Sequence, residues 1–199
     1  HTTDLAVDFG RKVRNLISTD AYQAIFSTVQ LASDSKSAGR WNTNTGGEYY
    51  ACGIGSALAG RGADLLLVDD PHSEQDVING NFSVFEKAYE WFTFGARTRL
   101  MPGGRVAIIQ TRWHMDDLTW RVTRDMAQNE RADEYEVVEF PAILEVENEE
   151  TDDIVEKPLW PEFFDLEALL RTKASMPTFQ WNAQYQQTPT AEEAALVKR

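Results

Sequence analysis

Two adjacent aspartates, Asp69 and Asp70, follow a run of four apolar residues in the stretch LLLVDDPH. Adjacent residues at the end of a strand diverge, so one carboxylate can hold Mg²⁺ while the other orients or deprotonates a water. This is the Walker B pattern of nucleotide hydrolysis. The pattern is equally compatible with a structural role, because Asp is also common where a strand leads into the N-terminus of a helix.

Two further side chains could complete a phosphoryl-transfer site. Thr111 lies in IIQTRW, directly after a second apolar strand, where its hydroxyl could contact water or a phosphate. Arg61 stands between two glycines, nine residues before Asp70, on a backbone flexible enough to swing a guanidinium toward a transferring phosphoryl group. Taken alone, the pattern at Thr111 favours a strand-to-loop turn, and a surface turn is the commoner case for Arg61.

The rest of a nucleotide site is not evident. The P-loop pattern GxxxxGK[ST] cradles phosphates with backbone amides and a lysine, and no Gly-Lys dipeptide occurs in the sequence. The ATP-binding residues are therefore unknown, and we expect the segment that carries them either to lie before His1 or to be absent. His72 and His114 each follow a strand tip, and with Asp69 they could bind a metal, although their spacing fits no zinc pattern. We interpret Cys52, the single cysteine, as a buried and unreactive thiol.

The elements that must position these residues alternate between strands and helices. Apolar runs predict buried strands over 65–68, 105–110 and 135–143. Apolar residues at helical spacing predict helices over 2–17, 79–100, 115–127 and 164–176. Shorter strands are expected over 40–43 and 48–55, around a turn that contains glycine. Because the central strands are apolar on both faces, we predict an α/β fold with a mostly parallel central sheet flanked by helices.

The net charge of −13 over 199 residues argues against a broad nucleic-acid-binding surface. The charge is uneven, because 133–156 holds eleven acidic residues and no Lys or Arg, whereas 96–131 holds seven arginines and four acids. We interpret 145–157 as an acidic surface loop or hairpin. No apolar run reaches the length of a membrane span, and no signal segment is recognisable, so we expect neither a membrane partner nor secretion.

Several segments together resemble the large terminase subunit of tailed bacteriophages, a motor that pumps DNA into a procapsid. These segments are GGEYYACGIGSALAGRGADLLLVDDPHSEQD, PGGRVAIIQTRWHMDDLTWRV, PLWPE, WNAQYQQTP and the closing VKR. They cover nearly the whole chain in the order that the family has. The resemblance implies a partial P-loop NTPase fold of the additional-strand, conserved-glutamate type. Residues 1–199 would be the distal part of the ATPase domain, with 178–199 a tail leading to a linker.

The resemblance also implies a role for each candidate residue. Asp69 would be the Mg²⁺ carboxylate and Asp70 the catalytic carboxylate, although the family often has Glu at the second place. Thr111 would belong to the coupling motif that links ATP hydrolysis to DNA movement. Arg61 resembles the arginine finger that some members supply to a neighbouring subunit's ATP, whereas other members use an arginine in the P-loop. The implied cofactors are Mg²⁺ and ATP, and the fragment alone is expected to be inactive.

The implied partners are double-stranded DNA, the portal protein, the small terminase subunit and further copies of the chain in a homo-oligomeric ring. The implied location is the host cytoplasm, with transient docking on the procapsid. Two alternatives remain open. The stretch DDPH also resembles a DExH-type box, which would make the protein a helicase-like nucleic-acid ATPase. A truncated ATPase retained for assembly would instead be a module without enzymatic activity.

Overall fold

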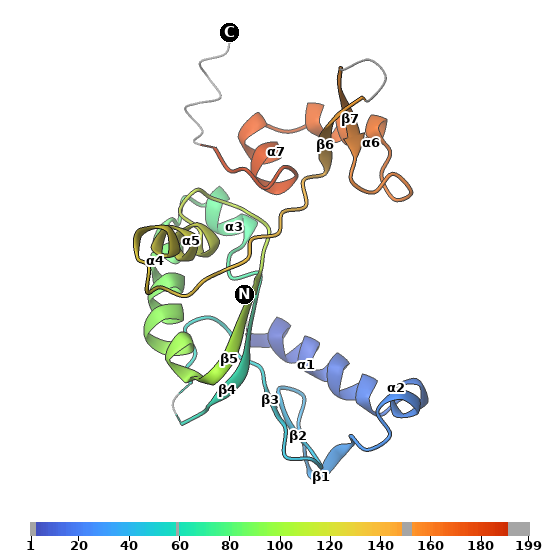
Figure 1. The fold of residues 1–199 in the computed structure, drawn as a ribbon, viewed down its shortest axis with the longest axis vertical. Helices are drawn as coiled ribbons and strands as arrows, with labels where there is room; N and C mark the ends of the chain where they lie inside the picture. The colour runs from blue at the N-terminus through green and yellow to red at the C-terminus, as the bar shows by residue number, and fades with distance from the viewer. Residues whose placement is uncertain (1–2, 59, 149–152, 191–199) are drawn as a thin grey trace. The chain divides into compact units, whose positions relative to one another are not determined.

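The computed structural model describes residues 3–58, 60–148 and 153–190 (Figure 1). The chain divides into two compact units, which we describe separately. Unit 1 comprises His1–Pro71 and Glu90–Ala107, and unit 2 comprises His72–Tyr89 and Ile108–Arg199. Among the described helices, none is both long and apolar enough to cross a membrane.

Unit 1 begins with two helices and a small antiparallel sheet. The elements are α1 (Thr3–Ile17), α2 (Asp20–Ile25), β1 (Leu31–Lys36), β2 (Arg40–Thr43) and β3 (Glu48–Tyr50), with β2 in the middle of the sheet. The buried indole of Trp41 stacks on Tyr49 with ring centroids 4.8 Å apart, and its Nε1 donates to the carbonyl oxygen of Gly10 at 3.1 Å. A Cβ at Gly10 would lie 2.8 Å from the Tyr49 ring, so only glycine allows α1 to approach the sheet this closely.

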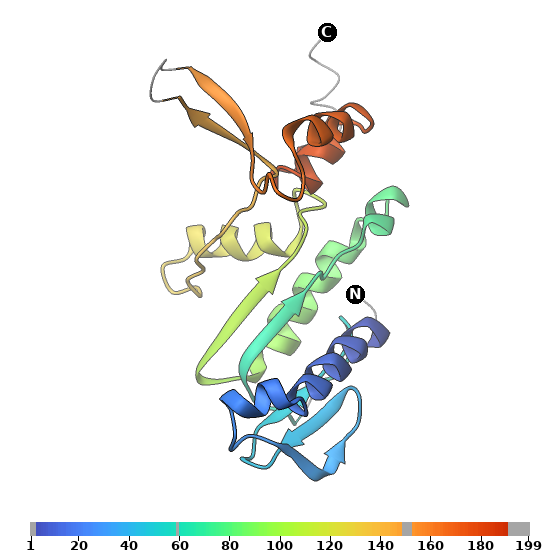
Figure 2. The same ribbon diagram turned by 90° about the vertical axis from the view of Figure 1, so that its right-hand side faces the viewer.

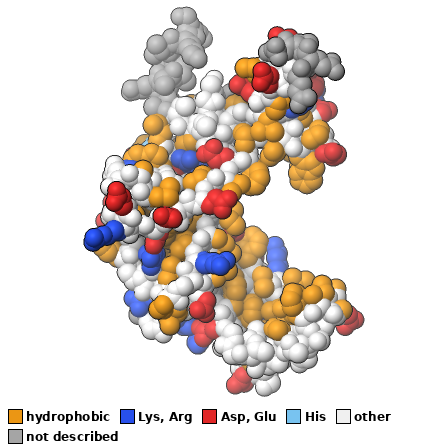
Figure 3. Space-filling view, viewed as in Figure 1, with side chains coloured by type: hydrophobic (Ala, Val, Ile, Leu, Met, Phe, Trp, Pro, Cys, Tyr) orange, Lys and Arg blue, Asp and Glu red, His pale blue; other side chains and the backbone are white. Residues whose placement is uncertain are grey.

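The strand that carries the two aspartates is β4 (Ala63–Asp69), which pairs with β5 (Leu100–Ile109). The two arrows run in the same direction in Figure 2, so this pair is parallel. On one face of β4, Val68 is buried, but on the other face Leu65 and Leu67 are 62% and 56% exposed. The prediction that this strand is buried on both faces is therefore wrong for the described residues. Other apolar side chains are also exposed on the face seen in Figure 3.

The connection from β4 to β5 is helical but interrupted. It contains α3 (Glu74–Ile78), α4 (Ser83–Glu90), a π-helical turn (Trp91–Ala96) and a 3₁₀ turn (Arg97–Arg99). The prediction of a single helix over 79–100 is therefore wrong at both ends, because α4 begins at Ser83 and the chain is no longer α-helical after Glu90. Gly80 has a φ of +63°, a left-handed conformation that ends α3 and separates it from α4.

The prediction of a mostly parallel central sheet is also wrong. The described strands form a three-stranded antiparallel sheet, the parallel β4–β5 pair and an antiparallel hairpin of β6 (Ile143–Glu147) and β7 (Ile154–Pro158), so the fold is mixed α/β with small sheets. The strand predicted over 135–143 begins only at Ile143, and the backbone of Ala142 before it bonds to Tyr185 and Leu159. The acidic segment does form the expected hairpin, although 149–152 lie outside the described residues.

The remaining helices all belong to unit 2. They are α5 (Leu118–Gln128), α6 (Leu166–Ala174) and α7 (Thr178–Gln184). A core of Ile143, Leu169 and Trp181 joins the hairpin to α6 and α7. The side chain of Gln186 reinforces this core, accepting from the Ile143 backbone N–H at 3.1 Å and donating to the Ile143 carbonyl at 3.0 Å. The first part of the expected tail is thus a packed helix, whereas 191–199 lie outside the described residues.

Candidate functional site

The turn after β4 carries the two predicted carboxylates. Asp69 is the last residue of β4 and is exposed, whereas Asp70 is half-buried and has a φ of +42°. This left-handed backbone costs most residues about 1–2 kcal/mol, and Asp is among the few non-glycine residues that adopt it. Burial raises the pKa of Tyr49, and the charge of Asp69 raises it further.

Neither aspartate caps the helix that follows. The N-cap of α3 is Ser73, whose hydroxyl accepts from the Asp76 backbone N–H at 3.3 Å. The Asp76 carboxylate in turn accepts from the Ser73 backbone N–H at 3.0 Å and from the Ser73 hydroxyl at 2.8 Å. This reciprocal capping box provides acceptors for the backbone N–H groups of Ser73 and Asp76. The N-cap position of α3, which the pattern allowed for one of the two aspartates, is thus occupied by Ser73.

Arg61 is held by strand β3 of the same unit. Its Nη1 lies 2.7 Å from the Glu48 carboxylate, and its guanidinium carbon lies 4.0 Å from the centre of the Tyr50 ring. Partly exposed ion pairs and cation–π contacts of this kind contribute on the order of 1 kcal/mol each. The Arg61 guanidinium therefore has two defined contacts. The free energy needed to break them is small enough for the side chain to move away.

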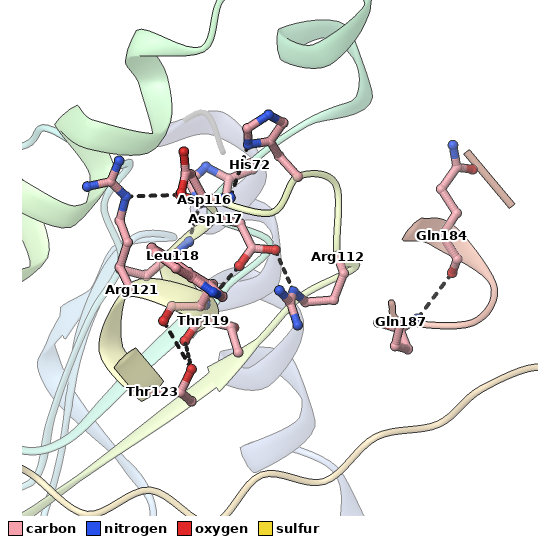
Figure 4. A network of polar contacts seen from close by, with 12 residues as sticks. His72, Arg112, Asp116, Asp117, Leu118, Thr119, Arg121, Thr123, Gln184 and Gln187 are labelled. Carbon is pink, nitrogen blue, oxygen red and sulfur yellow. Dashed lines mark hydrogen bonds and ion pairs between the residues drawn. The ribbon is translucent and has the colours of Figure 1, made fainter. Parts of the chain in front are cut away.

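Thr111 lies in unit 2, half-buried in the loop between β5 and α5. The residue after it, Arg112, donates from Nε to the Asp117 carboxylate at 2.6 Å (Figure 4). Asp117 is fully buried and is the N-cap of α5, where it accepts from the Trp120 backbone N–H at 3.0 Å. Burial raises the pKa of Asp117, and the positive charge of Arg112 opposes part of this effect. The loop that carries Thr111 is thus tied to the start of α5 by a buried ion pair.

His72 also reaches the start of α5. It is 1% exposed, and its Nε2 accepts from the Leu118 backbone N–H at 3.0 Å. Burial lowers the pKa of His72 to about 4, so the imidazole is neutral at pH 7 and, with Nε2 accepting, carries its proton on Nδ1. His72 packs edge-on against Phe85 with centroids 4.7 Å apart, and Phe85 stacks on His114 at 4.8 Å.

The two histidines thus lie near each other, as expected, on either side of a phenylalanine ring. In the parts of the chain that the structure describes, no cluster of three or more His, Cys, Asp or Glu residues could hold a metal ion. While Nε2 of His72 accepts from Leu118, that nitrogen is not available as a metal ligand. Burial raises the pKa of the half-buried Cys52, and the charge of Arg61 opposes it, in keeping with an unreactive thiol.

The predicted site residues fall into both units. Arg61, Asp69 and Asp70 lie in unit 1, and Thr111 lies in unit 2. Sequence reasoning missed the buried pair of Arg112 and Asp117, although an aspartate directly before the first apolar residue of a helix, here Leu118, is a recognisable capping signal.

Comparison with known proteins does not assign this chain to a family. No protein-family model matches the chain, and no curated protein matches it. The function must therefore be argued from the motifs and from the local geometry of each segment.

Proposed function

We propose that this chain carries the Walker B and coupling segments of an Mg²⁺-dependent ATPase domain of the kind found in the large terminase subunit of tailed bacteriophages. One observation supports this most strongly: β4 ends in two aspartates, and the helix after them is capped by Ser73 and Asp76 instead. The parallel pairing of β4 with β5 also supports it, because such sheets bind ligands at the carboxyl ends of their strands.

In this proposal Asp69 holds Mg²⁺, and Asp70 orients or deprotonates the water that attacks the terminal phosphate of ATP. Asp69 suits a hard cation, because its carboxylate is exposed and forms no ion pair with a Lys or Arg of the described residues. Mg²⁺ would neutralise charge that develops on the phosphate oxygens. Thr111 belongs to the coupling segment, and Arg61 is the candidate arginine finger for a neighbouring subunit.

Since the chain has no Gly-Lys dipeptide, the proposal assigns the phosphate cradle to another stretch of polypeptide in the same protein. The energy of hydrolysis would drive double-stranded DNA into a procapsid. The partners would be the portal protein, the small terminase subunit and further copies of the chain in a ring.

The test uses a polypeptide that contains this chain together with its phosphate-binding segment. It should hydrolyse ATP only with Mg²⁺, and Asp70→Asn should lower turnover at least about 100-fold while ATP binding is retained. Asn tolerates a left-handed backbone as Asp does, so the change removes the charge and leaves the turn intact. Asp69→Asn should instead raise the Mg²⁺ concentration needed for half-maximal turnover.

The matched control is Asp116→Asn, which neutralises an exposed aspartate of a second Asp–Asp pair. This variant should retain the parent turnover. If Asp70→Asn and Asp116→Asn have equal turnover, Asp70 has no part in the reaction. If the parent polypeptide does not hydrolyse ATP, the proposed function is wrong.

A further inference from the structure

The hydrogen bond from Leu118 to His72 joins two segments that are distant in sequence. Its partners are 46 residues apart, and they lie 3.0 Å from each other in unit 2 (Figure 4). The first backbone N–H groups of a helix have no partner within the helix, so an acceptor must come from elsewhere. For Leu118 that acceptor is an imidazole from the segment after β4, rather than a side chain of its own loop.

The imidazole is held in a closed environment. His72 is almost completely buried, and Phe85 and Leu118, which contact it, are buried as well. Water therefore cannot readily replace Nε2 as the acceptor, and loss of the imidazole would leave a buried N–H unsatisfied. The bond is for this reason a specific link, and not an exchangeable surface contact.

Short lengths of chain connect this link to the two candidate segments. His72 lies two residues after Asp70. On the other side, Arg112 follows Thr111 directly and is paired with Asp117, which precedes Leu118. His72 is thus connected to Asp70 by a short stretch of chain. Leu118 is connected to Thr111 through the buried ion pair of Arg112 and Asp117.

We propose that His72 is a positioning residue whose hydrogen bond to Leu118 links the turn of the two aspartates to the loop of Thr111. Displacement of one segment is then passed to the other through the N-terminus of α5. The coupling role rests on the proposed function, whereas the hydrogen bond itself does not.

The first experiment tests the bond in the unmodified 199-residue chain. Nitrogen-15 NMR of the imidazole should show a neutral His72 with its proton on Nδ1 and an unprotonated Nε2 that is coupled to the Leu118 amide. A proton on Nε2 at neutral pH would overturn the proposal. This measurement needs no substitution, so it stands even if a variant does not fold.

The second experiment uses two substitutions of His72. His72→Phe keeps a ring of similar size but removes the acceptor, and the amide of Leu118 should exchange its hydrogen at least about tenfold faster. His72→Gln places an amide oxygen near the position of Nε2 and should restore slow exchange. The control is His114→Phe, which removes a local bond from the Asp116 N–H and should leave Leu118 unchanged.

The third experiment measures ATP turnover in the longer polypeptide that contains the phosphate-binding segment. His72→Phe should lower kcat about tenfold or more with KM for ATP within twofold, and His72→Gln should recover most of the loss. Because His72→Gln would also restore stability, kcat is expressed per folded molecule, with the folded fraction measured by urea denaturation. A loss of kcat that persists per folded molecule in His72→Phe separates positioning from stability.

The outcomes distinguish the two proposals. If Leu118 exchanges faster in His72→Phe but kcat is unchanged, the bond exists and the positioning role is refuted. If the parent polypeptide lacks ATP turnover, the proposed function and the coupling role both fail, whereas the NMR result still decides whether the bond is present.

Discussion

Replacement of Arg112 by Met should destabilise the fold strongly, because it leaves a fully buried carboxylate without its cation. Arg112 Nε lies 2.6 Å from the carboxylate of Asp117, whose side chain is 0% exposed. Removal of one partner of a buried ion pair costs about 3–5 kcal/mol. Since Asp117 still accepts from the Trp120 N–H in the variant, we expect the lower end, about 3 kcal/mol. Urea denaturation at pH 7 measures the loss in free energy of unfolding.

The loss should depend on pH in a defined direction. Burial raises the pKa of Asp117 above its ordinary value of 3.8, and Arg112 counteracts part of this increase. A carboxyl whose pKa is higher in the folded state contributes stability below its unfolded pKa, and this stability is lost as the pH rises through the folded pKa. Without Arg112 the folded pKa rises further. The destabilisation by Arg112→Met should therefore shrink as the pH is lowered from 7 toward 4.

Two variants control for other effects of the substitution. Adding Asp117→Asn to Arg112→Met removes the charge, leaves an acceptor for the Trp120 N–H, and should recover most of the stability. Arg124→Met breaks a pair with Asp125 in which both side chains are about one third exposed, and it should cost less than about 1 kcal/mol. Equal losses for Arg112→Met and Arg124→Met at pH 7, or a loss independent of pH, would refute the argument from a buried charge.

Two further predictions concern buried side chains of unit 2. Burial lowers the pKa of His72 from 6.5 to about 4, so stability that is present above pH 6.5 should be lost as the pH falls to about 4. Other charges act on this pKa: Asp76 raises it, and Arg121 and His114 lower it. The loss corresponds to about 3 kcal/mol, and urea denaturation at pH 7 and 4.5 should show less of it in His72→Gln. Trp181→Ala should lower the free energy of unfolding by about 3–5 kcal/mol, because Trp181 is only 2% exposed. Trp160→Ala should lower it by less than about 1 kcal/mol, because Trp160 is 63% exposed. Similar melting curves for the two variants would contradict the described core.

Local patterns predicted the elements whose evidence lies within a few residues. The helices α1, α5 and α6 follow from apolar residues at helical spacing, and β2 follows from its position beside a glycine turn. The position of strand β4 was predicted correctly, but the prediction that both of its faces are buried was wrong. Four consecutive apolar residues indicate a strand, yet whether each face is covered depends on neighbours that a local pattern does not contain.

The third predicted strand failed for a related reason. The apolar residues over 135–142 suit a strand, but an isolated extended segment is stabilised only when another strand receives its hydrogen bonds. Ile143 pairs with Pro158 across the acidic hairpin, whereas Ala142 before it bonds through its backbone to Tyr185 and Leu159, and no strand is assigned over 135–142. Likewise the bond between His72 and Leu118 joins positions 46 residues apart, so no local spacing could reveal it.

Two of the three Asp–Asp dipeptides in the sequence, Asp69–Asp70 and Asp116–Asp117, show how the same dipeptide differs in role with its surroundings. In the pair of Asp116 and Asp117, the second residue caps α5 and is neutralised by Arg112, so a carboxylate is needed there for the fold. In the pair of Asp69 and Asp70, the helix cap is provided further on, by Ser73. The backbone of Asp70 is left-handed, a conformation that Gly would satisfy with less strain. The fold therefore uses Asp117, and not Asp70, as the N-cap of a helix. For this reason the two Asp→Asn substitutions should separate, with Asp117→Asn altering stability and its pH dependence and Asp70→Asn altering ATP turnover.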